Sequence, residues 1–284
     1  MKKNLFLIII MMTFLVYSCT EKMDIVLPTT YTRLIVDARI TTDTTAHRVL
    51  LSKTASYFDN SPPLPVTGAI ITIDDGNTTY PLTENILTPG LYQTAPNVYG
   101  VVGKTYNLII KNVDVTNSGV KQVFTASTTI NHIVKLDSIQ VKYNTDNPNR
   151  KSHRVYMYAQ DPPTLDFYTF RIYKNGVLMT DSLNKLRFTD DRLFNGNYML
   201  GLPIGNLSDN RAETVTYPGD TITVELSDIT KDYFNFLVGV QAAVAPQIPL
   251  FSGPPANVKG NVNNGAFGFF SGYSSSRASS VVIQ

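Results

Sequence analysis

The sequence is poor in cysteine, because Cys19 is the only one among its 284 residues. One cysteine cannot form a disulfide within the chain, whereas secreted domains commonly use disulfides to stabilise small cores. If the protein is exported, its fold must therefore depend on hydrophobic burial alone. The chain is long enough for this, since its length suits one large domain or two medium domains with proper cores.

Tryptophan is absent, and charged residues make up only 16% of the chain, below the quarter or so that is usual in globular proteins. Of 24 basic and 22 acidic residues, Lys2 and Lys3 precede Cys19, so the chain without them carries no net charge. A neutral chain has no basic field to attract nucleic acid, which excludes that partner. The absence of tryptophan weakens a glycan-binding hypothesis, although the 16 tyrosines could provide stacking surfaces instead.

An apolar run over residues 5–16 follows Lys2 and Lys3 and leads to Ser18 and Cys19. A positive start and a short apolar run are typical of a secretory signal peptide, and the run is shorter than the roughly 20 residues of a transmembrane helix. A small residue directly before Cys19 resembles a bacterial lipobox. We therefore predict a signal peptide over residues 1–18, acylation of Cys19 with lipid such as palmitate, and a tether over residues 19–32. Two alternative interpretations of this segment stay open: an ordinary signal peptide followed by a chance cysteine, and a short uncleaved anchor.

The first half of the chain is predicted to be a β-sandwich over residues 33–130. Residues 34–40 alternate between apolar and polar side chains, which is the period of a half-buried strand. Asp75 and Gly76 lie in a turn between two strand-like segments and predict a hairpin. Short strands between turn signals favour an immunoglobulin-like or transthyretin-like sandwich. The expected strands cover residues 34–40, 48–53, 69–73, 78–82, 90–94, 105–111 and 122–128.

A second β-rich domain that carries one helix is predicted over residues 131–284, which makes the whole chain mainly β. Both faces of residues 167–174 are apolar or aromatic, so this strand should be covered on both sides. The turn at Asn175 and Gly176 predicts a hairpin. The expected strands cover residues 136–143, 153–159, 167–174, 186–189, 220–226, 257–260, 265–273 and 279–283.

One amphipathic helix is expected at about residues 229–244. Ser227, Asp228 and Thr230 are candidate N-caps because their side chains can accept hydrogen bonds from the first free N–H groups of a helix. The apolar side chains have helical spacing and are predicted to share one face that packs on the core. They are Ile229, Tyr233, Phe236, Leu237, Val240 and Val244.

No catalytic or metal-binding motif is present in the sequence. His47, His132 and His153 have no partner at the spacing of a metal site, and neither a nucleophile elbow nor a phosphate-binding loop occurs. We therefore expect no cofactor and no metal ligands, and we assign no catalytic residue. Carboxylates at residues 74–77 and 190–192 could contribute to calcium binding, although a turn explains the first group better. A glycosidase pair of carboxylates from separate strands also stays open.

The candidate binding loop joins two predicted strands and carries charged and aromatic side chains. Binding residues favour loops that are held by a rigid scaffold. The residues that we predict to contribute are Asp190, Asp191, Arg192, Phe194 and Tyr198. The alternative is a structured turn in which Arg192 pairs locally with an aspartate.

Short motifs along nearly the whole chain after Cys19 resemble a family of uncharacterised lipoproteins from Bacteroidota that contain a domain of unknown function. The resemblance implies an accessory role, because members are typically encoded beside outer-membrane TonB-dependent receptors. It carries over no catalytic residue, because none is established in the family. The motifs cover residues 36–41, 65–69, 89–92, 103–106, 190–196, 218–221 and 254–261.

The resulting expectation is a non-enzymatic lipoprotein of the outer membrane, anchored by lipid on either the periplasmic or the cell-surface face. Its expected partners are the membrane, a TonB-dependent outer-membrane receptor and a small ligand. Two alternatives stay open. The first is a surface hydrolase for glycan or peptide with a site built from separated loops, and the second is a structural or adhesive surface protein.

Overall fold

The computed structural model describes residues 32–55, 62–144, 152–183, 185–208, 214–245 and 257–283. The predicted signal peptide, Cys19 and the tether up to residue 31 lie outside these residues. Residues 32–284 form one compact unit. Within the described residues, no helix combines the length and the apolar character that crossing a membrane requires.

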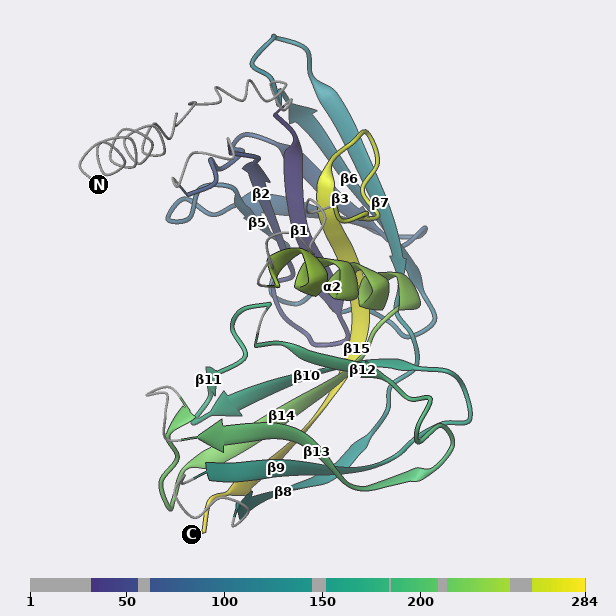
Figure 1. Ribbon diagram of the computed structural model, residues 1–284. Coiled ribbons are helices and arrows are strands. Elements are labelled where there is room, and N and C mark those ends of the chain that lie inside the picture. The colour runs from purple at the N-terminus through teal and green to yellow at the C-terminus, as the bar shows by residue number, and fades with distance from the viewer. Residues whose placement is uncertain are drawn as a thin grey trace, which may run out of the picture. The chain divides into compact units, whose positions relative to one another are not determined.

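The structure is mainly β, as predicted, with one large sheet and one helix in the described part of the chain (Figure 1). The large sheet has twelve strands, and a second sheet has three. The strands of the first half are β1 (Leu34–Thr41), β2 (Arg48–Lys53), β3 (Ile70–Asp74), β4 (Thr79–Glu84), β5 (Leu91–Gln93), β6 (Thr105–Val113) and β7 (Gln122–Thr129).

The second half contributes eight strands and the helix. They are β8 (Leu136–Tyr143), β9 (Ser152–Gln160), β10 (Phe167–Lys174), β11 (Val177–Leu178), β12 (Arg187–Asp190), β13 (Tyr198–Ser208), β14 (Thr221–Asp228), α2 (Lys231–Val244) and β15 (Phe267–Val281). The large sheet has the order β11-β10-β14-β15-β1-β2-β5-β4-β3-β6-β7, with β12 paired to β10, and the small sheet has the order β13-β9-β8.

The seven strands of the first half surround one hydrophobic core. Leu34, Val36, Ala38 and Ile40 of β1 all point into this core, which confirms the alternation predicted from the sequence. The predicted hairpin is present as β3 and β4, and Gly76 takes a positive φ of 86° in its turn. Burial of alternate apolar side chains is thus the main stabilising contribution in this half.

The long strand β15 connects the two halves of the structure. It pairs in parallel with β1 and antiparallel with β14, and Figure 1 shows it running between the two groups of strands. Phe270 belongs to the first core, whereas Ala278 packs against the second. The boundary that we predict near residue 130 stays a prediction, because the last strand of the chain takes part in both halves.

β15 is one continuous strand, so the prediction of two strands here, over residues 265–273 and 279–283, was wrong. The serines between them resemble a polar link, but they are satisfied inside the structure. Ser274 Oγ donates to His132 O at 2.6 Å, and Ser276 Oγ accepts from Leu136 N at 2.9 Å. The predicted strand over residues 257–260 is also absent, since these residues form no strand pairing.

The second core lies between β10, β14 and β15 on one side and the three-stranded sheet on the other. Residues 167–170 of β10 are buried on both faces, as predicted. A strand was expected after the candidate binding loop, but no bounds were predicted for β13, because Gly201, Pro203 and Gly205 interrupt its pattern. These residues are tolerated because β13 is an edge strand whose register shifts twice against β9.

The helix α2 begins two residues later than predicted, and Thr230 is its N-cap, with its hydroxyl accepting from Tyr233 N at 3.3 Å. Asp228 is no cap, since it is buried at the end of β14. The predicted face is correct for Tyr233, Phe236 and Leu237, which pack in a third cluster together with Ile229. Val244 instead is 61% exposed, and Phe234, which the pattern omitted, packs on Phe167 with ring centres 4.9 Å apart.

Candidate functional site

The predicted binding loop places its two charged partners at the surface. Arg192 Nη2 lies 2.7 Å from Asp190 Oδ2, and the side chain of Arg192 is 75% exposed. Arg192 thus pairs locally with an aspartate, as we expected for the alternative in which this loop is only a structured turn. Tyr198 begins β13 and is largely exposed. A binding role for these residues stays a prediction.

The other two residues of the loop turn inward. Asp191 is fully buried, its Oδ2 accepts a hydrogen bond from Asp166 N at 2.9 Å, and its backbone carbonyl accepts from Phe194 N at 2.7 Å. The ring of Phe194 stacks on Tyr168 of β10, with ring centres 6.4 Å apart. The five predicted residues therefore do not line one concave surface, because Asp191 and Phe194 support the loop from beneath.

Asp191 belongs to a group of four buried aspartates, which we call the acid cluster: Asp161, Asp166, Asp191 and Asp228. Burial raises the pKa of Asp166 and Asp191 above the usual range. Burial also raises the pKa of Asp228 to about 8, with the charges of the neighbouring aspartates adding to the effect. The sequence singled out Asp191 as a loop residue and Asp228 as a helix cap, but it did not connect the four residues, since they lie in separate segments with no motif spacing.

The carboxylates suspected of calcium binding at residues 74–77 form a turn instead. Asp74 Oδ1 accepts from Gly76 N at 2.8 Å, and Asp75 Oδ1 accepts from Thr78 N at 2.7 Å. Lys104 Nζ donates to Asp75 Oδ2 at 2.8 Å, and this bond lowers the pKa of Asp75 to about 2. These oxygens are thus satisfied by the hairpin itself, which is the interpretation that the sequence favoured.

A cavity of about 490 Å³, which we call the aromatic pocket, lies between α2 and the strands β1, β10 and β15. Figure 1 shows α2 crossing in front of this part of the sheet. Three of its rings pack together: Tyr233 and Phe236 of α2 have their centres 5.1 Å and 5.2 Å from that of Phe269 of β15. The volume falls in the range of about 300–1,000 Å³ that is typical of small-molecule sites.

Three arginines also line the aromatic pocket. Arg171 Nη1 binds Glu225 Oε1 at 3.2 Å, and its guanidinium lies 5.3 Å from the centre of the Tyr273 ring. Arg48 pairs with Asp37 at 2.8 Å. Arg39 forms no ion pair or hydrogen bond through its side chain with any residue that the structure describes. It is therefore the cation of this pocket with the most freedom to bind a ligand.

The phenol of Tyr233 is protonated at physiological pH, as any ordinary tyrosine is, and burial raises its pKa further, to about 12. Together with the guanidinium groups it presents hydrogen-bond donors to the pocket. Donors and aromatic faces suit the binding of a molecule that has both acceptor oxygens and an apolar or ring-shaped part. The sequence could not reveal this site, because its residues come from α2 and three strands that are far apart in the chain.

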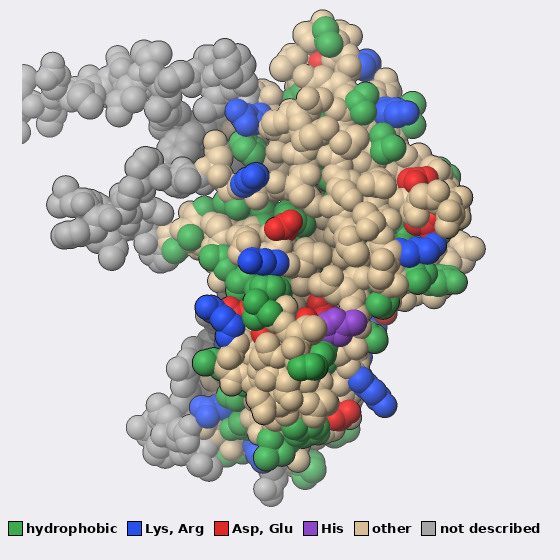
Figure 2. Space-filling view, turned by 90° about the vertical axis from the view of Figure 1, so that its right-hand side faces the viewer, with side chains coloured by type: hydrophobic (Ala, Val, Ile, Leu, Met, Phe, Trp, Pro, Cys, Tyr) green, Lys and Arg blue, Asp and Glu red, His purple; other side chains and the backbone are tan. Residues whose placement is uncertain are grey.

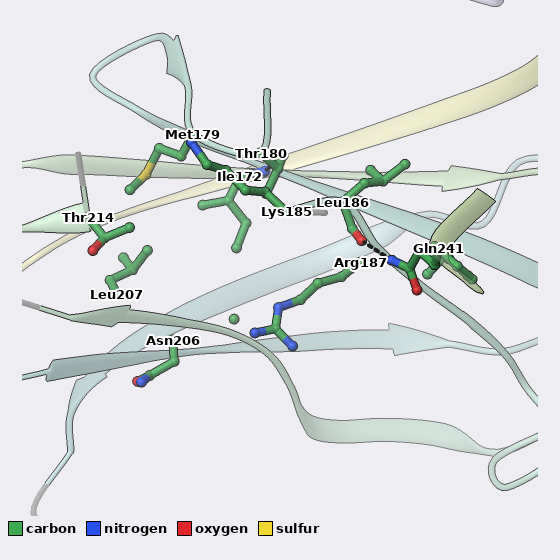
Figure 3. A pocket seen from close by; sticks show the side chains of 12 residues that line it. Ile172, Met179, Thr180, Lys185, Leu186, Arg187, Asn206, Leu207, Thr214 and Gln241 are labelled. Atoms are coloured by element: carbon green, nitrogen blue, oxygen red, sulfur yellow. Dashed lines mark hydrogen bonds between the residues drawn. The ribbon is translucent and has the colours of Figure 1, made fainter. Parts of the chain in front are cut away.

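A second cavity of about 470 Å³ lies between β10, β12 and β13. Figure 3 shows the guanidinium of Arg187 reaching into it below Leu186, with Ile172 and Leu207 forming apolar walls. Gln241 of α2 donates to the carbonyl of Leu186 at 3.3 Å and closes one side. Sequence reasoning placed Arg187 on a strand but assigned it no role.

The family described as "Domain of unknown function (DUF4249)" matches residues 20–279. The chain belongs to this family. The match begins directly after Cys19 and ends within β15, so it includes the aromatic pocket and the acid cluster. A comparison with curated proteins found no match.

Proposed function

We propose that this DUF4249 protein is a lipid-anchored, non-enzymatic protein of the outer membrane that binds a small ligand and assists a TonB-dependent nutrient transporter. The observation that carries the binding role is the aromatic pocket, a cavity of about 490 Å³ with aromatic walls and three arginines. Its walls belong to a packed sheet and helix, so the site is largely preformed. A preformed site avoids part of the ordering cost of binding.

The chemistry of the pocket indicates the class of ligand. Tyr233, Phe236 and Phe269 offer ring faces, while Arg39 and Arg171 offer guanidinium groups. A small molecule with an anionic or oxygen-rich end and an apolar or cyclic body would use both. The residues bind and orient, and none of the aromatic or guanidinium groups is a nucleophile or a base at neutral pH.

The anchor is supported by the leader. If Cys19 carries several acyl chains, each buried methylene contributes about 0.8 kcal/mol, and more than one chain suffices for stable anchoring. Changing Cys19→Ala should abolish labelling by a radiolabelled fatty acid and leave the protein soluble or held as a precursor. Unchanged labelling would refute the lipid anchor. Protease treatment of whole cells then decides the face, because only a surface-exposed protein is digested.

The transporter partnership is supported by the resemblance to lipoproteins encoded beside TonB-dependent receptors. The test is purification of a tagged chain, at native expression, from outer membranes solubilised in detergent. We expect a TonB-dependent receptor to co-purify in an amount comparable with the tagged chain. Recovery of the tagged chain without any transporter would contradict this part of the proposal.

The ligand is tested separately by native mass spectrometry of the protein purified from its own cells. We expect a small-molecule adduct that is lost in Phe269→Ala, because this change removes the ring at the centre of the aromatic pocket. Tyr99→Ala is the matched control, since Tyr99 is an exposed aromatic residue that does not line the pocket. Equal adducts in both variants, or no adduct in the unmodified protein, would count against the pocket.

A further inference from the structure

The acid cluster brings buried negative charge together with one histidine. Its four aspartates are each at most 6% exposed, and one carboxylate oxygen from each of Asp161, Asp166 and Asp191 lies within 4.8 Å of the others. Among the residues that the structure describes, no lysine or arginine forms an ion pair with any of the four. Buried carboxylates cost free energy unless a cation or a proton compensates them, so this cluster calls for a positive partner.

The partner on the protein side is His132, which approaches from the segment before β8. Its side chain is 39% exposed, whereas His47 and His153 are buried. Figure 2 shows a histidine that reaches the surface with acidic side chains beside it. Nε2 of His132 lies 3.2 Å from Asp228 Oδ2 and 3.5 Å from Asp166 Oδ2. The imidazole and the two carboxylates thus each place one atom, Nε2 or Oδ2, close to the same point.

These three atoms do not satisfy one another by hydrogen bonding. Nε2 of His132 and Oδ2 of Asp228 are both inaccessible to solvent, and neither makes a hydrogen bond with any group in the described part of the chain. Two polar atoms that lie 3.2 Å apart without a hydrogen bond between them can both be directed at an ion bound beside them. Atoms that bind one metal ion at about 2.0–2.2 Å lie roughly 3.0–3.5 Å apart, which matches the two distances from Nε2 of His132. The two carboxylate oxygens lie within 4.8 Å of each other.

Neighbouring groups hold the two carboxylates in this arrangement. Asn131 Nδ2 donates to Asp228 Oδ1 at 3.0 Å, which leaves Oδ2 directed at the histidine. Thr164 Oγ1 donates to Asp166 Oδ2 at 2.9 Å. Hydrogen bonds from such outer partners orient metal ligands, and removing one typically lowers the affinity for the metal by about ten- to a hundredfold.

The remaining two aspartates supply charge around the three atoms. Both oxygens of Asp161 are already used, by Tyr168 Oη at 2.7 Å and by Gly196 N at 2.9 Å. Asp191 Oδ1 has no hydrogen-bond partner among the described residues. Their negative charge would strengthen the attraction of a cation bound between the other residues.

We propose that His132, Asp166 and Asp228 bind one divalent first-row transition ion, such as Zn²⁺ or Mn²⁺. One imidazole and two carboxylates suit these ions, whereas a site for Ca²⁺ would be built from oxygens alone. The sequence gives no indication of this site, because the three residues lie in separate segments. The ion would offset part of the negative charge of the acid cluster and join β14, the loop before β10 and the segment before β8.

The experiment is calorimetric titration of the full chain in detergent, stripped with a chelator, with Zn²⁺, Mn²⁺ and Ca²⁺ in turn. We expect one Zn²⁺ or Mn²⁺ per chain and a higher Tm in the metal-loaded protein. His132→Gln and Asp228→Asn should each weaken binding at least tenfold. Asp75→Asn is the matched control, because it removes a similarly buried carboxylate in a turn, and it should leave metal binding unchanged.

Three results would overturn the proposal. They are the absence of saturable binding, unchanged affinity in both ligand variants, and binding of Ca²⁺ to the unmodified protein as tight as that of Zn²⁺. Pulsed electron paramagnetic resonance of the Mn²⁺-loaded, unmodified protein provides a test that needs no variant. We expect coupling of the metal to the nitrogen of one imidazole, and a spectrum without nitrogen coupling would also refute the site.

Discussion

Each half of the structure contains one distinctive group of acidic side chains, and the two groups have opposite surroundings. In the first half, Asp75, Glu84 and Asp114 lie in or beside turns and accept hydrogen bonds from backbone N–H groups. In the second half, the acid cluster is buried, and Asp191 and Asp228 each keep an oxygen without a hydrogen-bond partner in the described residues. Both halves have a well-packed core, so the difference lies in their polar groups.

The pKa values differ in the same way between these turn acids and the acid cluster. The pKa of Asp75 falls to about 2 through its bond with Lys104, and that of Glu84 is lowered because bonds from Gly68 and Gly90 outweigh its partial burial. The pKa of Asp191 is raised by burial, and that of Asp228 is raised to about 8. Acids of the first kind stabilise the fold, whereas acids of the second kind cost stability. Groups with perturbed pKa values in a cluster are typical of functional sites.

The largest expected effect concerns the strand that both halves share. Gly268 of β15 has a φ of 98°, and an added Cβ would lie 1.9 Å from the carbonyl oxygen of Val36 in β1. Gly268→Ala should lower the free energy of unfolding by roughly 3 kcal/mol or more, because the clash is with backbone. Gly219→Ala is the control, since Gly219 has a φ of 95° but nothing within 4 Å, and it should cost about 1–2 kcal/mol.

The measurement for this pair is urea unfolding followed in both halves by hydrogen exchange. If the halves depend on each other through β15, the protection of amides in β6 and in β9 should fall together in Gly268→Ala. A loss that is confined to one half would show that the two halves are independent, and it would favour a domain boundary near residue 130.

The second prediction is a substitution at a buried residue that should stabilise the protein, whereas most such substitutions destabilise it. In protein stripped of metal, Asp228→Asn should raise the free energy of unfolding at neutral pH, by about 1–3 kcal/mol, the cost of an unsatisfied buried polar group. Because burial raises the pKa of Asp228 to about 8, folding at neutral pH requires this carboxyl to take up a proton, which costs free energy. The amide is neutral in both states and keeps an oxygen that can accept from Asn131. Thermal unfolding in chelator measures the effect. A clear loss of stability would mean that the carboxylate is compensated without metal.

The third prediction concerns Asp75, where the same substitution should have the opposite effect. The pKa in the folded state, about 2, lies below the value of about 3.9 in unfolded chains. Its stabilising contribution is therefore complete above about pH 4 and is lost as pH falls through about 2. Asp75→Asn should be less stable than the unmodified protein at pH 6, and urea unfolding at decreasing pH should show the two curves converging. Parallel curves down to pH 2 would contradict the pairing with Lys104.

The smallest effect is expected at the ion pair of the predicted binding loop, in which Arg192 is exposed and Asp190 is partly buried. Arg192→Ala breaks a surface ion pair with Asp190, and such pairs contribute little because solvent screens them. The free energy of unfolding should not change measurably in urea unfolding. A marked loss would show that the loop supports the buried residues beneath it more strongly than its exposed contacts indicate.

The fold could be predicted where the sequence pattern involves only residues that are neighbours in the chain. The alternation in β1 and the Asp-Gly turn of the first hairpin are properties of neighbouring residues, and both predictions were confirmed. The prediction failed at β13 and at the middle of β15, where glycine, proline or serine interrupts the pattern. In both places, pairing with other strands and hydrogen bonds from distant residues override the local preference.

The candidate sites were harder to predict for the same reason. Asp228 has the local context of a helix cap and was interpreted as one, but Thr230 takes that position and Asp228 turns toward His132. Asp191 was noticed because it lies in a polar loop, although its side chain points inward. The acid cluster and the aromatic pocket join residues that are separated by whole strands, so no spacing along the chain could indicate them.

The sequence by itself determined that the protein is mainly β, where most strands and the helix lie, and that one hairpin turns at Gly76. It is also the whole basis for predicting a leader that ends at Cys19. The tertiary structure decided that one strand serves both halves, that four aspartates meet a histidine, and that α2 closes a pocket over the sheet. The physical reason is that periodicity and turn chemistry act between neighbours in the chain, whereas burial, charge and cavities arise between residues that only folding brings together.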